Sequence, residues 1–523
     1  MSKSNSMSKS KSISKRPKKY SECRKKPQAE CIKLEKCVYT NGLTRKYCRL
    51  KNNKRGEETA NERSPKKVKR TLKLKPKDRD AKDRDAKERD TKARGVIQRF
   101  MNKTKHRRKA LFLRAVCLDS GVCLAFGAYE NDIKKHFSGF ANFEYATAPI
   151  KRIGSPSANG FINEIQYDHR GYKAYAVLKS SMRPGSDNLM YEYVVGQYVN
   201  KFNKRFPCFL ETYGYYIYNN DIKINDKMVW TFLKNTKITA TMDTIKKGLV
   251  LQKTTDYAKA CKQSKYLAIL IQHLKGIQSI KHMVRNAHFV THELLNMLFQ
   301  IYVPLSMVAN TFTHYDLHHE NANLYEPAKD SYIQFHYHTG GNNVVSFKSK
   351  YIAKIIDYGR SYFKDEESGE DSKKIYTDLC KEKKCNPDCG YNTGFSWLTQ
   401  HPDVSVSYWI TSQTRNKSHD LRLLNDLKGD LTRYNTETNL TAGVKAIMQK
   451  LKYDTIYGTP EMENGYPNTV NNIVDAATML FQYIKEENQV QLNENEYRGK
   501  IKLGDLHIYC GQDDRRPMQF IKV

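Results

Sequence analysis

The stretch "THYDLHHENANLYEP", residues 313–327, decides how this 523-residue chain is interpreted. It carries His314, Asp316 and Asn321 at short spacings ahead of an apolar run. Asp316 and Asn321 are five positions apart on one predicted loop, so the carboxylate can take a hydroxyl proton while the amide turns back toward a metal ion. The stretch therefore predicts a site for phosphoryl transfer.

A second oxygen ligand follows an apolar strand farther along the chain. The run "YIAKII" (351–356) leads into Asp357, and Gly359 would allow a sharp backbone turn just beyond it. Mg²⁺ is usually held by one or two carboxylates together with the phosphates of a nucleotide. Asp357 and Asn321 are therefore candidate Mg²⁺ ligands, with ATP as the phosphoryl donor.

Upstream, the hydrophobic pattern predicts a small sheet and one helix. The segments "GFINEIQYD" (160–168) and "YKAYAVLKS" (172–180) alternate as strands do, and a helix is predicted over 187–202. Glu192 falls on the apolar face of that helix, where a buried carboxylate requires a cationic partner such as Lys179.

The rest of the chain indicates a second, mostly helical part. A Tyr-rich strand is predicted at 209–218, helices dominate from about 277, and 332–349 reads as a hairpin around "TGGNN". The expected fold class is therefore α+β in two lobes, a small β-rich one followed by a mostly helical one.

The ordered motifs resemble those of the protein kinase superfamily. "HYDLHHEN" resembles the catalytic-loop motif HRDLKPEN, and "DYG" resembles DFG. The resemblance implies that Asp316 is the catalytic base and that His314 belongs to the same catalytic loop. It also implies that Asn321 and Asp357 bind Mg²⁺, with Gly359 supporting the turn.

Four further segments match the family in order. "AYAVLK" resembles VAIK, "IGSPSANGF" stands at the glycine-rich loop, "LAILIQHLKG" resembles the fifth strand and hinge, and "KSHDLRLL" carries the aspartate that supports the catalytic loop. The residues that the resemblance assigns to ATP binding or support are Lys179, Glu192, Gly154, Gly160, Gln272, Leu274 and Asp420.

Charge and the resemblance, which covers roughly residues 145–430, together predict the organisation of the chain. Composition predicts a basic tail over 1–110, followed by a linker or lead-in over 111–145. The resemblance implies a kinase-like N-lobe with its hinge over 146–276 and a C-lobe with insertions over 277–523. Together with these motifs, the Lys-, Asn- and Tyr-rich amino-acid composition most resembles that of the divergent kinase-like proteins of large nucleocytoplasmic DNA viruses. The implied activity is that of a serine/threonine protein kinase acting on a protein substrate.

Departures from the family pattern keep two alternatives open. Pro156 stiffens the glycine loop, which favours a catalytically weak pseudokinase or a structural virion protein. Tyr315 replaces an Arg, which removes a partner for a phosphorylated activation loop. His318 and "DYGRS" also resemble aminoglycoside and choline phosphotransferases, which favours a small-molecule substrate.

Positive charge is concentrated in the tail. Residues 1–110 hold 39 Lys and Arg against 12 Asp and Glu, a net charge of +27 out of +35 for the chain. Such a composition predicts disorder, and contact with nucleic acid through phosphates or with an acidic partner protein. The repeat at 77–94 reads as a charged spacer, and "SPKKVKR" (64–70) is a candidate nuclear targeting signal.

Cysteine and histidine usage gives weaker indications. Twelve Cys in a long chain without a secretory signal favour reduced thiols or metal ligands over disulfides. The Cys cluster at 23–48 is as consistent with zinc as with no ligand. Cys380, Cys385 and Cys389 are candidate zinc ligands in the activation segment. The histidines outside His314 are interpreted as ordinary surface or core residues.

No run of about 18 uncharged apolar residues occurs in the chain. The sequence therefore predicts an intracellular protein, in host cytoplasm, nucleus or virion if it is viral, that is neither secreted nor transmembrane.

Overall fold

The computed structural model divides the chain into two compact units, Met1–Val96 and Ile97–Val523. It describes residues 31, 33, 37–41, 46–50, 130–154, 160–182, 187–235, 242–252, 266–375, 393–396, 409–453, 469–511 and 514–522. In the first unit, strand β1 (Cys37–Asn41) pairs antiparallel with β2 (Lys46–Leu50).

Several predictions fall outside the described residues. They concern Pro156, the repeat at 77–94, the basic cluster at 64–70, and the possible zinc ligands Cys380, Cys385 and Cys389. Cys31 is disulfide-bonded, which differs from the expected reduced thiol or metal ligand. An oxidised sulfur offers no thiolate to a metal ion. Cys208 and Cys510 are free and buried, as expected for thiols in a packed core.

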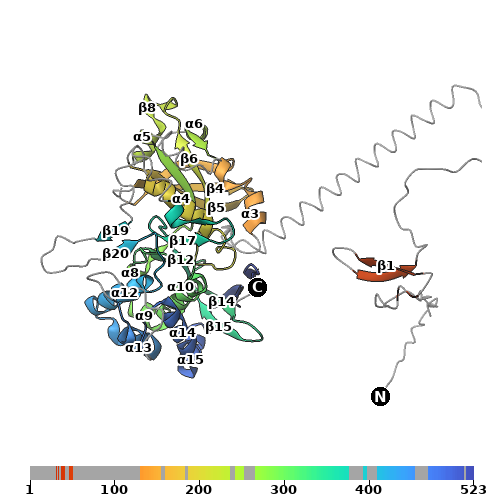
Figure 1. The fold of residues 1–523 in the computed structure, drawn as a ribbon, viewed down its shortest axis with the longest axis vertical. Coiled ribbons are helices and arrows are strands. Elements are labelled where there is room, and N and C mark those ends of the chain that lie inside the picture. Colours follow the sequence, from red (N-terminus) through yellow and green to blue (C-terminus); the bar gives the residue numbers. More distant parts are fainter. Residues whose placement is uncertain are drawn as a thin grey trace, which may run out of the picture. The chain divides into compact units, whose positions relative to one another are not determined.

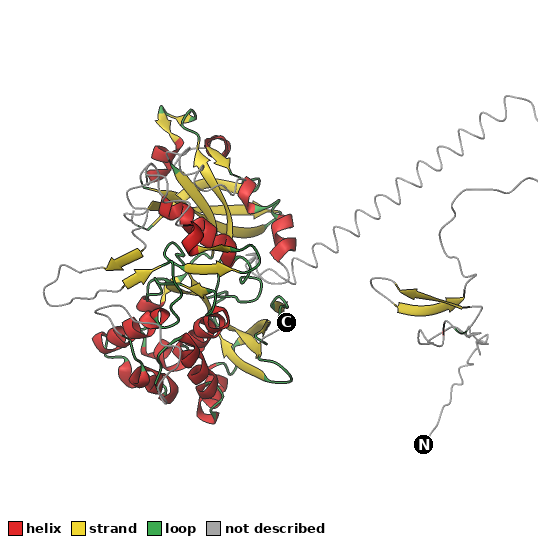
Figure 2. Cartoon of the chain, viewed as in Figure 1, coloured by secondary structure: helices red, strands yellow, loops and turns green. Residues whose placement is uncertain are grey.

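The second unit is mixed α+β and begins with a curled antiparallel sheet (Figure 1, Figure 2). The strand order is β3 (Ala146–Ile153), β4 (Gly160–His169), β5 (Tyr172–Ser181), β10 (Leu267–His273), β6 (Thr212–Tyr218) and β9 (Leu249–Leu251). The predicted strands at 160–168 and 172–180 are confirmed because their alternating pattern matches the two faces of the sheet.

The two faces of this sheet are buried in different cores. In β10, Ile269 and Ile271 pack with Leu189 and Met190 of helix α4 (Asp187–Val199), whereas Leu270 belongs to a core on the opposite face. That opposite core is covered by the smaller elements of the region. They are α3 (Glu130–His136), η2 (Phe140–Asn142), β7 (Lys223–Ile224), α5 (Val229–Lys234) and α6 (Met242–Gly248), while β8 (Lys227–Met228) pairs with β7 outside this core.

Helix α4 ends earlier than the predicted 202. The Asn200 side chain accepts a hydrogen bond from the Thr212 amide at 2.9 Å and donates one to the Thr212 carbonyl at 2.8 Å, which fastens the helix end to β6. Phe202 lies in the turn that follows, where its amide bonds to the Val199 carbonyl at 2.8 Å. A side chain that binds backbone groups in this way competes with continued helix.

The second half of the unit is mainly helical, as the sequence predicts. Its helices are α8 (Ile280–Met283), α9 (Ala287–His292), α10 (Leu294–Val308), η3 (His419–Leu421), α12 (Arg422–Arg433), η4 (Glu437–Asn439), α13 (Ala442–Lys450), α14 (Ile473–Tyr483) and α15 (Glu487–Glu496). Almost every residue of α10 is buried, and it packs against α14 and strand β16. A helix apolar on all sides is a core helix.

Two small three-stranded sheets lie next in sequence to the segments that carry Asp316, Asn321 and Asp357. One sheet contains β11 (Gln278–Ser279), β13 (Ala322–Tyr325) and β16 (Ile352–Ile355), and another contains β12 (Phe312–Thr313), β17 (Tyr362–Asp365) and β18 (Glu370–Asp371). A separate pair is formed by β19 (Thr393–Ser396) and β20 (Trp409–Thr411).

The predicted hairpin is confirmed and lies in a larger sheet. Strand β14 (Ser331–His338) pairs antiparallel with β15 (Val344–Ser349). It also pairs in parallel with β21 (Ile501–Tyr509), which in turn pairs with β22 (Gln519–Lys522). Among the described residues, no helix is both long and apolar enough to span a bilayer.

Candidate active site

Lys179 stands at the centre of a partly buried group of charges between the sheet and the helical region. Strand β5 presents it, and its Nζ lies 2.6 Å from Glu192 Oε2 on α4 and 3.0 Å from Asp357 Oδ1 after β16. The Glu192 side chain is 2% exposed, whereas that of Asp357 is 42% exposed. The predicted pairing of Lys179 with Glu192 is thus present, and Asp357 completes a triad.

The three charges of this triad respond differently to burial. Burial disfavours the ammonium, but Asp357 and Glu192 outweigh it and raise the pKa of Lys179. For Glu192, burial dominates over the attraction of Lys179 and raises the pKa to about 7. For Asp357, burial is outweighed by the charge and hydrogen bond of Lys179, and the pKa is lowered. Lys179 therefore stays cationic and Asp357 anionic near neutral pH.

Asp357 occupies an unusual backbone conformation. Its φ is 68°, in the left-handed region that a non-glycine residue rarely adopts. The sequence places the sharp turn at Gly359, whereas the left-handed residue is Asp357 itself. The next side chain, Tyr358, is buried and its hydroxyl accepts a hydrogen bond from the Leu210 amide at 3.1 Å. The turn is thereby held so that the Asp357 carboxylate faces Lys179.

The loop with Asp316 and Asn321 is folded back on itself. The Asn321 amide group donates to the Asp316 carbonyl at 2.9 Å, and the Asn321 backbone N–H donates to the His318 carbonyl at 2.9 Å. Tyr315 has a φ of 61° at the start of this turn. The side-chain oxygen of Asn321 is the ligand type that hard cations prefer.

Asp420 holds this loop through hydrogen bonds to two of its backbone amides. Its Oδ2 accepts a hydrogen bond from the His314 amide at 2.7 Å, and its Oδ1 accepts one from the Tyr315 amide at 2.9 Å. Burial raises the pKa of Asp420 to about 7, although both N–H groups oppose the rise. The predicted supporting role of Asp420 agrees with this geometry.

His314 is fully buried and connects the loop to the Asp357 segment. Its Nε2 lies 3.0 Å from the carbonyl of Ile356, the residue before Asp357. Burial lowers the pKa of His314, so the neutral ring donates through Nε2–H. A side chain without solvent contact cannot meet a substrate, so this geometry favours a positioning role for His314 over direct chemistry.

Two arginines beside Asp316 were not predicted from the sequence. Arg422 Nη1 lies 2.9 Å from Asp316 Oδ1, and Arg360 Nε lies 3.9 Å from Asp316 Oδ2. Each arginine is close in sequence to a recognised motif, Arg422 two positions after Asp420 and Arg360 directly after "DYG". That adjacency was the only available signal.

An apolar pocket opens beside the triad. It is lined by Ile153, Ile162, Val177, Leu210, Ile271, Leu274, Ile277 and Ile356, and also by Lys179, Glu192, Gln272, His273, Lys354, Asp357 and Tyr358. A mostly apolar wall with a few charged groups suits a flat ring bearing an anionic tail. Gln272 and Leu274, which the resemblance assigns to ATP binding, both line this pocket, whereas Lys354 was not singled out in the sequence.

The two glycines of the predicted loop differ in what they permit. Gly154, after β3, has a φ of 67°. Gly160 starts β4, and a Cβ there would lie 2.3 Å from the Ser180 carbonyl oxygen. Gly154 therefore requires glycine for its backbone conformation, and Gly160 requires glycine because there is no room for a side chain.

The sequence-predicted residues form two linked groups. Lys179, Glu192 and Asp357 make the triad, and Asp316, Asn321 and Asp420 make the loop. His314 joins the two through Ile356. A scan against protein-family models and a search of curated proteins found no match to this chain.

Proposed function

We propose that the chain is an ATP- and Mg²⁺-dependent phosphotransferase that transfers the γ-phosphoryl group to a hydroxyl. The observation that carries the proposal is the triad, in which Lys179 contacts Glu192 and Asp357 at the wall of an apolar pocket. Phosphoryl transfer needs a held cation, a Mg²⁺ ligand and little else from the protein.

Each residue then has a physical role. Lys179 contacts the α- and β-phosphates and is oriented by Glu192. Asp357 and the Asn321 side-chain oxygen hold Mg²⁺, which neutralises charge on the phosphates. Asp316 orients the acceptor hydroxyl and takes its proton. His314 and Asp420 fix the loop through the hydrogen bonds described above.

In this proposal the fold is a two-lobed protein kinase fold of the divergent viral kind, with 146–276 as the N-lobe and 277–523 as the C-lobe. The pocket would take adenine, with the backbone around Gln272 and Leu274 as hinge. The order of the elements supports it, because strands β3–β5, α4, strands β6, β9 and β10, the Asp316 loop and the Asp357 segment follow one another along the chain.

A direct experiment compares Asp357→Asn and Asp316→Asn with Lys151→Met, an exposed lysine on the same sheet. Transfer of labelled phosphate from ATP to a panel of basic proteins is measured with Mg²⁺. We expect both Asn variants to lose transfer while Lys151→Met retains it, because only the first two change the metal ligand and the base. Retained activity in both Asn variants would contradict the proposal.

A second candidate is a nucleotide-binding module with weak or no catalysis. The observation that favours it is the contact of Arg422 with Asp316, since the Asp316 oxygen bound by the guanidinium would have to leave it to meet an acceptor hydroxyl. Titration with Mg²⁺ and ATP in a thermal melt separates the two. A bound ligand at 100 times its dissociation constant stabilises by about 2.7 kcal/mol. A shift without phosphate transfer would select the second candidate.

The acceptor is proposed to be a Ser or Thr hydroxyl of a protein. His318, 3.9 Å from Asp316, stands where protein kinases carry a lysine, so small-molecule acceptors belong in the same assay. Aminoglycosides and choline are therefore tested beside the basic proteins. Transfer to a small molecule alone would reassign the substrate class without changing the chemistry.

A further inference from the structure

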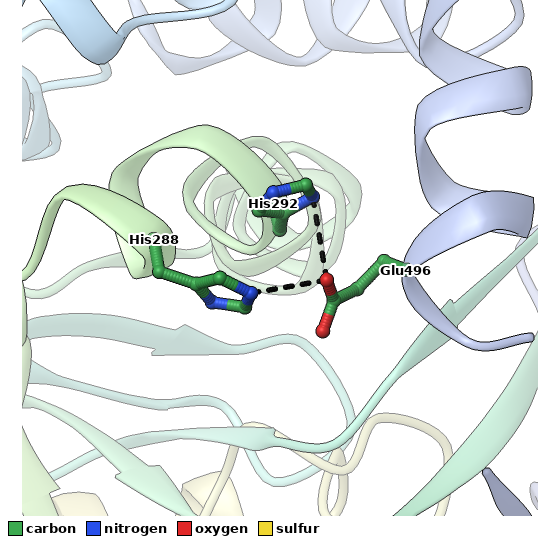
Figure 3. A group of neighbouring side chains, drawn as sticks. All are labelled: His288, His292 and Glu496. Atoms are coloured by element: carbon green, nitrogen blue, oxygen red, sulfur yellow. Dashed lines mark hydrogen bonds and ion pairs between the residues drawn. The ribbon is translucent and has the colours of Figure 1, made fainter.

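A cluster of two imidazoles and a carboxylate lies in the helical region. His288 and His292 come from α9, and Glu496 is the last residue of α15 (Figure 3). The ligand atoms of all three lie within 4.8 Å of one another. Neither histidine was distinguished from ordinary surface residues in the sequence, although their spacing of four places both on one helix face.

The arrangement of atoms leaves one nitrogen unsatisfied. His288 Nε2 lies 3.0 Å from Glu496 Oε2, a normal hydrogen bond, whereas His292 Nδ1 lies 3.6 Å from the same oxygen. This separation is too long for a hydrogen bond, and His292 Nδ1 is buried without a hydrogen-bond partner in the part of the chain described. His292 Nδ1 and His288 Nε2 thus face the same carboxylate oxygen, Glu496 Oε2 (Figure 3).

We propose that His288, His292 and Glu496 form a binding site for a divalent transition-metal ion of the zinc class. Tetrahedral zinc with bonds of about 2.0–2.1 Å separates its ligand atoms by roughly 3.3 Å, close to the spacings found here. Two imidazoles and one carboxylate are a known three-ligand set for zinc that leaves one position for water. The His288 side chain is 49% exposed, so water reaches that position.

The surroundings hold the ligands in place. Asn286 accepts hydrogen bonds from the His288 and Phe289 amides and so fixes the start of α9. Lys500 pairs with the other carboxylate oxygen of Glu496, which orients it as an outer-shell partner does. Lys500 and Lys350 also place positive charge near His292, which opposes a cation. The affinity is therefore expected to be lower than that of a site without nearby lysines.

The bound ion would act as a clamp. Glu496 lies 204 positions beyond His292, and β21, which begins at Ile501, follows it closely. An ion shared by α9 and α15 would fix the chain that leads into β21. The site is separate from the proposed phosphotransferase residues, so its presence does not depend on that function.

The first experiment measures zinc bound per chain. The full chain is stripped with a chelator, dialysed against ZnCl₂ and analysed for metal, and the same is done with His288→Ala, Glu496→Gln and the control His282→Ala. His282 is an exposed histidine of α8 outside the cluster. Because cysteines elsewhere offer zinc ligands, only the difference between proteins is interpreted.

We expect His288→Ala and Glu496→Gln each to bind one zinc ion fewer than the wild type, and His282→Ala to bind the same number. Co²⁺ should give visible absorption that is weaker in the same two variants than in the wild type, and a 100-fold excess of Mg²⁺ should not remove this difference, because imidazole favours transition metals. Zinc should also slow hydrogen exchange over 487–509. Equal zinc content in the wild type and both cluster variants would overturn the proposal.

Discussion

Glu192 and Glu293 are buried to a similar extent, but one lies in the cleft beside the sheet and the other in the helical region. Glu192 is paired with a cation, Lys179, and has Asp357 close by. The Glu293 carboxyl group has no cation as close: Ser349 Oγ donates to it at 2.8 Å, and the hydroxyl of Tyr497 and the backbone N–H of Lys350 also donate to it. The contacts of Glu192 hold the charged ammonium group of Lys179 in position. The contacts of Glu293 can form with a carboxyl group that is neutral.

The two carboxyl groups thus differ in their surroundings, and we propose that the first belongs to a functional site and the second to a structural contact. A cation held between two carboxylates costs desolvation free energy and contributes little to stability. Such an arrangement is typical of functional sites. Hydrogen bonds from Ser349 and Tyr497 join α9, β15 and the end of α15, which is a structural task. The predictions below test this distinction.

The largest effect is expected on phosphate transfer. Lys179→Met should lower transfer from ATP by on the order of 10²–10³-fold, because a fixed donor to developing charge is lost. Ser349→Ala should leave the rate unchanged, since its network lies away from the pocket. Initial rates are measured at a temperature where circular dichroism shows both variants folded. An equal loss of phosphate transfer in the two variants would contradict the proposed difference between the Lys179 group and the Glu293 contacts.

The next effect concerns stability. At pH 8, Lys179→Met leaves Glu192 beside Asp357 without a cation, which is expected to cost about 3–5 kcal/mol. Tyr497→Phe leaves the Lys350 amide, now 2.9 Å from the Tyr497 hydroxyl, without that acceptor, at a cost of about 1–3 kcal/mol. Urea unfolding of the full chain compares them. A larger loss in Tyr497→Phe would reverse the interpretation of the two networks.

Measuring stability as a function of pH tests whether the Glu293 carboxyl group is neutral in the folded protein. Burial raises the pKa of Glu293 to about 8, from 4.5. Below pH 4.5 the group is protonated in both states and its stabilisation is complete. Between pH 4.5 and 8 only the unfolded chain ionises, so stability falls by up to about 1.4 kcal/mol per pH unit. Glu293→Gln should remove this component, seen as a smaller difference between melts at pH 5 and 8. An unchanged pH dependence would show that Glu293 ionises normally.

The smallest effect is expected from an exposed pair that joins the segment after α4 to β17. Lys201, just after α4, lies 2.8 Å from Asp365 at the end of β17, and its side chain is 38% exposed. Lys201→Met should change stability by less than about 1 kcal/mol, because water screens this pair. A loss as large as that of Lys179→Met would mean that burial does not set the size of the effect.

Local pattern predicted much of the fold. Alternation identified β4 and β5, and the "TGGNN" turn identified the β14–β15 hairpin, because both signals are contained in a few neighbouring residues. The parallel pairing of β14 with β21 was not predicted, since Ser331 and Ile501 are far apart in the chain and parallel pairs carry no turn signal. The end of α4 was misjudged because a contact with β6 sets it.

As with the fold, the parts of the candidate site that depend on local sequence were predictable, and those that depend on distant packing were not. The position of Glu192 on an apolar helix face required a partner, and Lys179 is that partner. The contact of Arg422 with Asp316 depends on how α12 packs beneath the loop, which no local pattern encodes. The cluster of His288, His292 and Glu496 required α15 to be brought beside α9, so its histidines alone gave no decisive signal.

The pairing of β14 with β21 has a consequence for synthesis on the ribosome. The hairpin ends at Ser349 and its parallel partner begins at Ile501, with roughly 150 residues between them. At about 5–20 residues per second, translation takes roughly 8–30 seconds to supply that partner. During this interval one edge of β14 has no strand beside it, and an open edge invites pairing with other chains. We therefore expect the nascent chain to be most prone to aggregation between the synthesis of β15 and that of β21.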